Sequence, residues 1–491
     1  MDLKEHPSTR NNEWSSAFRT AVKITLVVAP FLIGLKGFLI YIKSPTTDDI
    51  LEAAYRSLNF YVLNSEESVI NNWMLQLARW TAPIVTASGI LLILQRIRIL
   101  VHNNAAYIRG GAVAVYGEGP DADMIREQLS RRAVQDEYSF VRADKYVLAG
   151  DQDTNIKLWN QFKDRIGDKP VFIKDDGLLG RMLTGNVYTF DPAENAARQY
   201  WKERCLYSLS KENGHQISVC LVNFGTLGKA LLLSGLLQNI FDPGQRITYH
   251  VFDGADEFRN LYHELSQMTD EIHFYPDGWF SHLQIIKDAH RVIVCEDMSL
   301  LSKLLFAVPG IPVDVLSGTG RINSFFDDKN RITLFDWRSR SMRLEHIFQD
   351  TLIRNAKKIN MRYERIYSEG SVEETEENME RLWGRLDGFT RYSNISAADY
   401  HEIQRIMLQE DGMTVEDMEK DQEYLEKLAE LEHIRWCRYH YLNNWKRGSA
   451  PEGKKDMIRR LHPLLVEYSE LDPLNRSKDR SNLIELFGLD L

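Results

Sequence analysis

Residues 112–122 read AVAVYGEGPDA, a short apolar run followed by the pattern GxGxxA and then by a helical pattern. Between a strand and a helix, Gly117 permits a tight turn, and Gly119 lets the backbone approach a pyrophosphate at the helix N-terminus. Ala122 holds the third position, and Asp144 is the nearest candidate for the acid that ends the second strand. The stretch therefore predicts a dinucleotide-binding fold, or the same fold without its ligand.

A second unit of the same kind begins at residue 217. The apolar run ISVCLV leads into NFGTLGKA at residues 223–230, with Gly225 and Gly228 in the turn. Asp253 ends the next strand, where an acid would hold a ribose hydroxyl. The turn departs from a P-loop at two of its four key positions, so we reject ATP hydrolysis there and interpret it as a glycine-depleted dinucleotide turn.

Around both turns, strand patterns alternate with helical ones. Further strands of the first sheet are expected at residues 146–150 and 170–173. Those of the second sheet are expected at residues 247–252, 272–275, 292–295, 313–316 and 332–335. Such alternation specifies parallel, doubly wound sheets, so this part of the fold is predicted to be α/β with two Rossmann-like domains in tandem.

Two long apolar stretches precede these domains. Residues 24–42 read ITLVVAPFLIGLKGFLIYI, and residues 77–94 read LARWTAPIVTASGILLIL. At the rise of an α-helix each covers about 27 Å, close to the hydrocarbon thickness of a bilayer. They predict two transmembrane helices, with buried core helices as the alternative.

Basic residues fix the expected topology. They precede the first stretch at Lys4, Arg10, Arg19 and Lys23, and follow the second at Arg96, Arg98 and Arg109. This bias places both termini in the cytoplasm of a multi-pass membrane protein. Two spans cannot enclose a pore, so conduction would need a homo-oligomer, for which a dimer or a tetramer is expected.

The segment between the two stretches limits what such a pore could select. Residues 43–78 contain no glycine, so they cannot supply a glycine-containing potassium filter. Lys36, within the first stretch, either extends its charge to the interface or faces a pore.

Composition excludes several classes of function. Among 491 residues, 60 Lys and Arg against 70 Asp and Glu give a net charge of −10, which argues against nucleic acid as a partner. Four scattered cysteines without a CxxC pair argue against a disulfide framework or a cysteine zinc site. Without a GxSxG or HExxH motif or a complete P-loop, we expect no catalytic residues and no enzymatic activity.

The C-terminal part follows an acidic stretch at residues 368–380, the expected linker. Its main helix is expected at residues 424–445 and contains Trp436 and Trp445. Nine positions apart, these rings would point to opposite sides of one unbroken helix, so at most one would line a given cleft. Core packing is the alternative for both.

Two kinds of polar side chain accompany the tryptophans. His433, Cys437 and His440 share a helical face, but a fourth ligand is not apparent, so no metal site is predicted. A basic cluster suited to phosphates follows, with members Arg447, Lys454, Lys455, Arg459 and Arg460.

Two resemblances extend this interpretation. The two apolar stretches, YRSLNFYVLN at residues 55–64, ARWTAP at 78–83 and the GxGxxA turn resemble bacterial Trk-type potassium-transport and channel-regulator proteins with an RCK (TrkA-N) domain. That resemblance covers roughly residues 20–340. It implies a bacterial inner membrane, ion transport, and NAD(H) or another adenine nucleotide as cofactor.

The C-terminal part resembles the RyR repeat, a small helical domain named for ryanodine receptors. The matching positions are His433, Trp436, Trp445, His462, Pro463, Leu465, Tyr468, Leu471, Asp479 and Arg480. Asn444 stands where the family has the glycine of its GW pair. The resemblance implies an adenine-nucleotide-like ligand, for which the candidate residues are His433, Trp436, Trp445, Arg447 and Tyr468.

The predicted organisation has five parts. They are a membrane part at residues 1–104, Rossmann-like domains at 105–212 and 213–367, a linker at 368–380 and an RyR-like domain at 381–491. The first functional hypothesis is a ligand-gated membrane effector, which by its domain order suits an antiphage system that senses a nucleotide second messenger. The others are an ion-transport regulator that responds to NAD(H), and a membrane-tethered scaffold with inert nucleotide folds.

Overall fold

The computed structural model describes residues 24–64, 72–136, 139–175, 186–318, 331–367 and 372–488. The chain forms two compact units, Met1–Ala105 and Ala106–Leu491.

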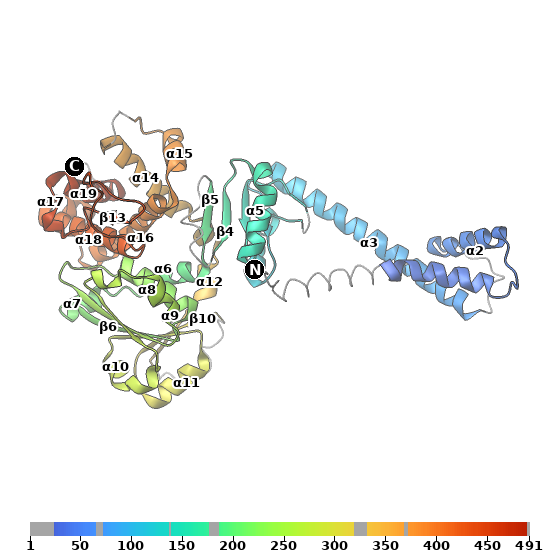
Figure 1. Cartoon of the computed structure of the whole chain (residues 1–491), viewed down its shortest axis with the longest axis horizontal. Helices are drawn as coiled ribbons and strands as arrows, with labels where there is room; N and C mark the ends of the chain where they lie inside the picture. The colour runs from blue at the N-terminus through green and yellow to red at the C-terminus, as the bar shows by residue number, and fades with distance from the viewer. Residues whose placement is uncertain are drawn as a thin grey trace. The chain divides into compact units, whose positions relative to one another are not determined.

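The N-terminal unit is helical (Figure 1). It contains the apolar helix Ile24–Leu39, then α2 (Thr47–Asn59) with the short 3-10 turn η1 (Phe60–Val62), and α3 (Trp73–Arg109). Of the helices that the structure describes, α3 alone is long and apolar enough to cross a membrane. The two expected spans thus correspond to one long apolar helix and one shorter one.

Small residues let the three helices approach closely. A Cβ added at Gly34 would lie 2.9 Å from the Ser57 hydroxyl of α2, and one added at Gly37 would lie 2.8 Å from the Leu75 side chain of α3. Close helix approach at glycine positions is typical of helix packing in membranes.

Side-chain hydrogen bonds to the backbone fix how the chain turns within this unit. The Tyr61 hydroxyl donates to the Val27 carbonyl at 2.6 Å, and the Thr86 hydroxyl donates to the Tyr61 carbonyl at 2.8 Å. The Asn72 amide donates to the Gly37 carbonyl at 2.9 Å. Helix α2 therefore runs antiparallel to the first helix, and the residues after it lie near Val27. Helix α3 then begins near Gly37, towards the other end of the first helix.

The second unit contains two parallel sheets. The first has five strands in the order β2-β1-β3-β4-β5. These strands are β1 (Val113–Tyr116), β2 (Ala133–Val134), β3 (Lys145–Leu148), β4 (Val171–Lys174) and β5 (Val187–Phe190). Helices α4 (Pro120–Leu129) and α5 (Gln152–Ile166) complete the alternation.

The second sheet has six parallel strands in the order β11-β10-β9-β6-β7-β8. They are β6 (Gln216–Val222), β7 (Arg246–Phe252), β8 (Glu271–Tyr275), β9 (Arg291–Cys295), β10 (Val313–Ser317) and β11 (Ile332–Asp336). Read from β8, this is the strand order 3-2-1-4-5-6 of dinucleotide-binding folds. The predicted mixture of helices and parallel sheets is confirmed.

Helices between and around these sheets join them. They are α6 (Pro192–Glu203), α7 (Tyr207–Glu212), α8 (Gly225–Gln238), α9 (Asp256–Leu261), α10 (Leu283–Asp288), α11 (Met298–Ala307), α12 (Trp337–Ser341) and α13 (Leu344–Phe348). Helix α6 follows the last strand of the first sheet and packs on α8 of the second domain. The two domains thus share buried surface.

The C-terminal helices are α14 (Asp350–Tyr367), α15 (Glu376–Arg385), α16 (Gly388–Glu410), α17 (Val415–Lys420), α18 (Gln422–Tyr441) and α19 (Pro473–Phe487). A short parallel pair, β12 (Lys446–Arg447) and β13 (Leu461–His462), lies between the last two. Figure 1 shows these helices gathered at the C-terminal end of the second unit.

Two expected boundaries differ from the structure. Helix α14 packs on α15, α16 and α19, so residues 350–367 lie with the C-terminal helices and not with the second Rossmann-like domain. Residues 376–380 of the expected linker begin α15, where the Thr375 side chain accepts from the Asn378 amide and caps the helix. Residues 368–371 lie outside the described part.

The C-terminal helices share a core with both sheets. One apolar cluster joins Val115 and Phe172 of the first sheet to Trp383 of α15 and Ala398 of α16. Another joins the second sheet to Tyr400, Leu428 and further residues of α16 and α18. The C-terminal helices are therefore built into the second unit rather than held by a linker.

A buried ion pair holds α18 against the second sheet. Arg438 donates to Asp270 at 2.6 Å and to the Leu236 carbonyl at 3.1 Å. The other oxygen of Asp270 accepts from the Ile247 amide at the start of β7, at 3.0 Å. Both side chains of the pair are buried, so removal of either one would leave an uncompensated charge in the core.

We expect Arg438→Ala to destabilise the protein by about 3–5 kcal/mol, because the buried Asp270 carboxylate loses its partner. The matched control is Arg447→Ala, which breaks the exposed pair with Glu470 and should cost less than about 1 kcal/mol. Denaturant unfolding of the detergent-solubilised protein, followed by tryptophan fluorescence, measures both. Equal effects of the two substitutions would contradict the importance of the buried pair.

Candidate functional site

The first glycine turn has the geometry of its motif. Gly117 has φ +113°, and a Cβ there would lie 2.4 Å from the Gly150 nitrogen at the end of β3, so only glycine fits. Gly119 has φ +106° and is the N-cap residue of α4. Ala122 is fully buried against the sheet.

The negative charge at this first glycine turn disfavours the binding of a pyrophosphate. Asp121, in the first turn of α4, contacts Lys174 at 2.5 Å and Arg338 at 2.8 Å. The Arg126 guanidinium donates to the Gly117 carbonyl at 2.6 Å. The N-terminus of α4, which would attract phosphate, thus already has a carboxylate with its own cations.

The prediction for the ribose acid of this domain is wrong. Asp144 precedes β3 and accepts from the Ala112 amide at 2.9 Å, so it lies at the amino edge of the sheet. Ligands of such sheets bind at the carboxyl edge. Asp136 follows β2 at that edge and is buried. Its position 19 residues after Gly117 matches the usual spacing of about 20, and this spacing is the signal in the sequence that points to Asp136 rather than Asp144.

At the second glycine turn, residues 223–230, side-chain contacts occupy the space near the ends of the strands. Asn223 has φ +61°, and its side chain donates to the Cys295 carbonyl at 2.6 Å, which bridges the ends of β6 and β9. Gly225 has φ +39° and begins α8. A Cβ at Gly228 would lie 3.0 Å from the buried Phe224 ring. This hydrogen bond lies between β6 and β9, where the strand order reverses. In folds of this kind, dinucleotides bind at that point.

Asp253 lies where the sequence predicts a ribose acid. It follows β7 with φ +67° and lines a small cavity with Arg259 and Tyr275. Burial, reinforced by the charge of Asp277, raises the pKa of this carboxyl. The position suits a hydroxyl ligand, but Gly225 and Gly228 are not among the residues that line the cavity of Asp253.

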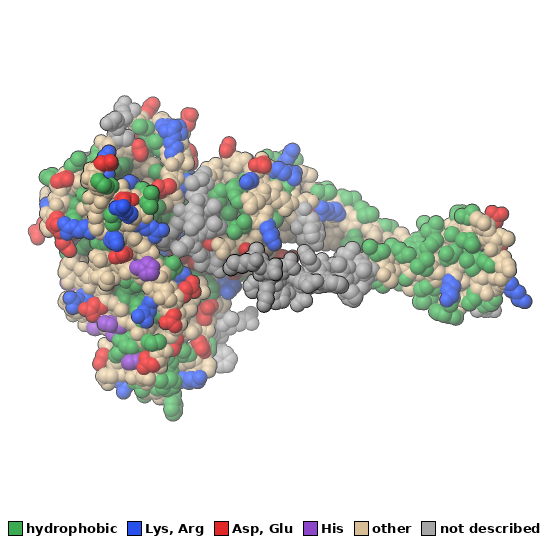
Figure 2. All heavy atoms as spheres, viewed as in Figure 1, with side chains coloured by type: hydrophobic (Ala, Val, Ile, Leu, Met, Phe, Trp, Pro, Cys, Tyr) green, Lys and Arg blue, Asp and Glu red, His purple; other side chains and the backbone are tan. Residues whose placement is uncertain are grey.

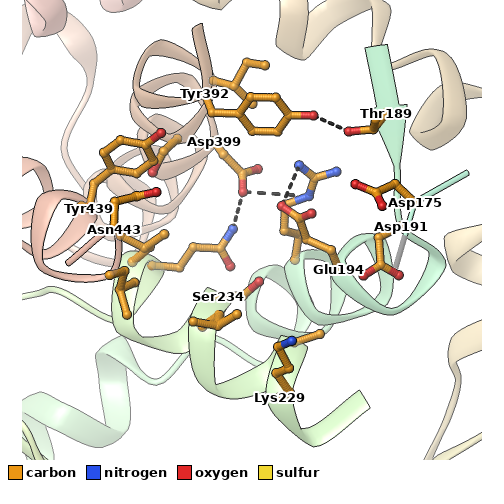
Figure 3. A pocket seen from close by; sticks show the side chains of 18 of the residues that line it. Asp175, Thr189, Asp191, Glu194, Lys229, Ser234, Tyr392, Asp399, Tyr439 and Asn443 are labelled. Atoms are coloured by element: carbon orange, nitrogen blue, oxygen red, sulfur yellow. Dashed lines mark hydrogen bonds and ion pairs between the residues drawn. The ribbon is translucent and has the colours of Figure 1, made fainter. Parts of the chain in front are cut away.

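A cavity of about 130 Å³ lies where α6, α8, α16 and the end of α18 meet the carboxyl ends of β4 and β5 (Figure 3). Its walls contain four carboxylates, which are Asp175, Asp191, Glu194 and Asp399. Asp399 accepts from Gln238 at 2.6 Å and pairs with Lys202 at 2.8 Å. Two cations, Arg198 and Lys229, also line it. The carboxylates still outnumber the cations, and this disfavours phosphate-bearing ligands.

A larger cavity, of about 320 Å³, lies among the C-terminal helices and is called here the C-terminal cavity. Residues of α14, α16, α18 and α19 line it, together with residues of the segment between α18 and α19. Its ring-bearing walls are Tyr363, Phe389, His433, Trp436, His440, Trp445 and His462. A cavity of this size and lining is typical of small-molecule sites.

The prediction that the rings of Trp436 and Trp445 point to opposite sides is wrong, because the helix ends between them. Helix α18 ends at Tyr441, and Asn444 takes the left-handed conformation with φ +58°. The Trp445 amide then donates back to the His440 carbonyl at 3.0 Å. Trp445 is thereby turned to the same side as Trp436, and both line the cavity.

The two rings nevertheless differ in role. Trp445 is only 3% exposed and stacks on Phe389 at 5.3 Å between centroids, so it is largely a core residue. Trp436 is half-buried and packs against His440 at 4.0 Å and edge-on against His462 at 4.9 Å. Trp436 therefore offers the better face for a planar ligand.

His433 is a buried cation at the base of the cavity. One ring nitrogen faces the Asp479 carboxylate at 3.2 Å, and the other faces the Val466 carbonyl at 2.9 Å, so both must donate. Although burial opposes the charge, the hydrogen bonds to Asp479 and to the Cys437 thiol raise the pKa of His433 to about 11. Burial also raises the pKa of Asp479, but the carbonyl on the far side of His433 favours the imidazolium–carboxylate pair.

The other two histidines of the cavity are neutral. Burial lowers the pKa of His440 to about 3 and that of His462 to about 4. The Nδ1 atom of His462 accepts from the Leu464 amide at 3.2 Å, which leaves its Nε2 atom as a donor. These rings can therefore give or accept hydrogen bonds without adding charge.

Two lysines supply positive charge. Lys455, from the predicted basic cluster, lines the cavity together with Lys478. The sequence predictions missed Lys478, although it directly precedes Asp479 of the family pattern. Two ammonium groups beside an aromatic wall can hold a phosphate next to a stacked base.

Two of the predicted ligand residues, Arg447 and Tyr468, do not line the cavity, and Lys36, predicted for the interface or a pore, lies in the other unit. Arg447 is exposed and pairs with Glu470 at 3.0 Å. The Tyr468 hydroxyl donates to Glu426 at 3.0 Å, and its ring lies 5.8 Å from that of His433. Lys36 is exposed on the helix Ile24–Leu39 of the N-terminal unit.

Within the described ranges, no group of three or more His, Cys, Asp or Glu side chains is arranged to hold a metal ion. Comparisons with family models, with curated proteins and with solved structures find no match to this chain. The candidate site therefore rests on its own geometry.

The charge of His433 predicts a dependence of stability on pH. Because its folded pKa of about 11 lies above the unfolded value near 6.5, its contribution is complete below about pH 6.5 and is lost as the pH rises towards 11. We expect the melting temperature to fall from pH 7 to pH 10 more steeply for the native protein than for His433→Gln. Parallel curves would contradict the ion pair, and His263→Gln, an exposed histidine, is the control.

Proposed function

We propose that this chain is a ligand-gated protein of a bacterial cytoplasmic membrane. The C-terminal cavity binds a nucleotide-derived ligand, and the N-terminal units of a homo-oligomer form the pore or membrane-disrupting element that the ligand controls. The antiphage setting implied by the two resemblances is part of this proposal. Catalysis is not part of it.

The observation that carries the proposal is the composition of the C-terminal cavity. It combines the half-buried indole of Trp436, neutral donors and acceptors on His440 and His462, and the ammonium groups of Lys455 and Lys478. These are the groups that a base, a sugar and a phosphate require. The acidic cavity and the acidic first turn of α4 lack that combination.

The membrane part of the proposal is supported by α3. Over much of its length this helix is apolar, and side chains such as Ile84, Leu91, Ile93 and Ile97 are more than a third exposed within the chain. In water such a surface would be unstable, whereas lipid or a second copy of the chain would cover it.

A second candidate function is ion-transport regulation by NAD(H) at the second Rossmann-like domain. The strand order 3-2-1-4-5-6 and the position of Asp253 favour it. The bridge from Asn223 to Cys295 must open for a dinucleotide to cross that edge. If neither the C-terminal cavity nor the second Rossmann-like domain binds a nucleotide, the third hypothesis, an inert membrane-tethered scaffold, is supported.

The first test is a thermal-shift series on the detergent-solubilised full chain with AMP, ADP-ribose, NAD⁺, NADH and cyclic nucleotides. A ligand that binds only the folded state raises the melting temperature by mass action. A shift that Trp436→Ala removes and Asp253→Asn retains supports the C-terminal cavity. The reverse pattern supports the NAD(H) regulator, and the absence of every shift supports the scaffold.

For a nucleotide that shifts the melting temperature, we expect Trp436→Ala to weaken binding by about 1–3 kcal/mol, because a base loses its stacking partner. Trp436→Phe keeps an aromatic face and should retain most of the affinity. Titration calorimetry measures both. Equal affinity of the alanine and native proteins would exclude stacking on this ring.

We further expect Lys455→Gln and Lys478→Gln to weaken the binding of AMP while leaving that of adenosine nearly unchanged. Each lysine forms a charge-assisted contact that only the phosphate can accept, worth about 1.5–3 kcal/mol. The control is Lys454→Gln, a neighbouring lysine that does not line the cavity. If adenosine and AMP lose affinity alike, the lysines do not contact the phosphate.

A further inference from the structure

Helix α3 extends beyond the membrane if it spans the bilayer as proposed above. Its 37 residues measure about 55 Å along the axis, whereas the predicted span 77–94 accounts for about 27 Å. Arg96 and Arg98 mark the cytoplasmic end of that span. Ile108 lies about 18 Å beyond Arg96, and the headgroup layer on one side of a bilayer is only about 5–8 Å thick. The last turns of α3 are therefore in water.

These last turns nevertheless carry exposed apolar side chains. Ile97, Val101 and Ile108 are 50%, 62% and 83% exposed. Figure 2 shows hydrophobic side chains, in green, along α3. Ala106, which is buried in a core of the first sheet, lies on the opposite side of the helix, about 140–180° from these three residues. The side of α3 that packs on the sheet is therefore not its apolar side.

The spacing of the apolar residues is that of a coiled coil. From residue 87 to residue 108, exposed side chains recur at alternating intervals of three and four positions, which gives three consecutive heptads. Such a repeat is typical of helices that pack on one another along their length. Its seven members are called here the α3 seam and are Ala87, Ile90, Leu94, Ile97, Val101, Asn104 and Ile108.

The basic side chains of this part of α3 lie away from the seam. Arg96, Arg98 and Arg109 lie about 80–120° from the centre of the seam around the helix axis. Arg96 and Arg98 are at the level of the lipid headgroups, where anionic lipids attract them. Copies of the helix can therefore meet at the seam without bringing like charges into contact.

A second copy of the chain is the partner that fits the seam. Lipid does not reach Asn104 and Ile108, because they lie beyond the headgroup layer. The rest of the described chain leaves every member of the seam exposed. Copies inserted with the same topology have parallel α3 helices, and parallel helices of identical sequence bring each seam position to its own counterpart.

The residue types at the seam indicate how many copies assemble. Leu94 occupies the first position of its heptad, and Ile90 and Ile97 occupy the fourth. Leucine at the first position with isoleucine at the fourth favours three or four helices over two. Asn104 is the polar member of the seam, and a single polar residue in such a seam fixes the register of the helices.

We propose that the α3 helices of three or four copies of the chain pack along this seam into a parallel coiled coil, which continues from the inner part of the bilayer into the cytoplasm. This deepens the homo-oligomer proposed above and rests on it. The coiled coil holds the copies together at the place where each α3 leaves the membrane.

The test uses single cysteines in the full chain, reconstituted in liposomes and oxidised with copper phenanthroline. Val101→Cys and Ile108→Cys lie in the seam. His102→Cys and Arg109→Cys, each one residue further along the helix, are the matched controls at nearly the same height. The native protein gives the background, since its four cysteines are buried or partly buried. The melting temperature of each variant is first compared with that of the native protein.

We expect cross-linked pairs of chains to form at least about tenfold faster at each seam position than at its control, because a disulfide needs Cβ atoms about 3.5–4.5 Å apart. Equal rates within each pair, faster cross-linking at the controls, or no cross-linking at all would overturn the proposal. If one variant does not fold, the other pair of positions decides.

Native mass spectrometry of the detergent-solubilised chain gives a second test that does not depend on cysteine chemistry. We expect an assembly of three or four copies, which Val101→Asp shifts towards single chains and His102→Asp leaves intact. A native protein of one chain, or an assembly that Val101→Asp leaves unchanged, would overturn the proposal, and two chains would overturn the number of helices. Cross-links at the seam without current on addition of AMP, ADP-ribose or a cyclic nucleotide would support the seam and count instead against the ligand-gated function.

Discussion

The arrangement of the second unit depends on the ion pair between Arg438 and Asp270. Charges buried in a core must stay paired, because separating them costs several kcal/mol. Helix α18 therefore cannot slide or rotate against the second sheet without losing this contact. The same helix carries His433 and Trp436 on another side, in the wall of the C-terminal cavity. The constraint that fixes α18 thus also fixes the cavity relative to the Rossmann-like domain.

Much of the α/β part could be predicted because its strands are buried on both faces. The run ISVCLV corresponds to β6, and the expected strand at residues 247–252 corresponds to β7. The place of the C-terminal helices could not be predicted in this way. The contacts of α14 with α16 and α19 join residues far apart in the chain, and such contacts leave no periodic signal. Acidic composition likewise suggested a linker where Thr375 caps a helix, since both are rich in Glu.

The candidate site shows the same limit at the scale of single residues. The types of side chain that line the cavity could be read from the sequence, but their directions depend on one backbone conformation. Asn444 takes a left-handed conformation that few residues other than glycine adopt readily, and it thereby reverses the expected direction of Trp445. Its side chain also donates to the Leu261 carbonyl at 2.9 Å, which ties the break to the second domain. Asp144 failed as a ribose acid because an acid before a strand and one after it look alike in sequence, although they lie at opposite edges of a sheet.

Control of a membrane element by this cavity must satisfy an energetic condition. Helix α16 contributes Ala397 to the cavity wall and Ala398 to the core on one face of the first sheet, and Ala106 of α3 packs into the core on the opposite face. A continuous set of packed elements thus joins the cavity to the end of α3.

A ligand that drives a two-state change from 1:99 to 99:1 must prefer one state by about 5.5 kcal/mol. Stacking on one indole supplies only about 1–3 kcal/mol. Phosphate contacts that differ between the two states, or one equivalent cavity in each copy of an oligomer, would supply the remainder. The preference needed from each copy of a tetramer is then about 1.4 kcal/mol, within reach of one charge-assisted hydrogen bond.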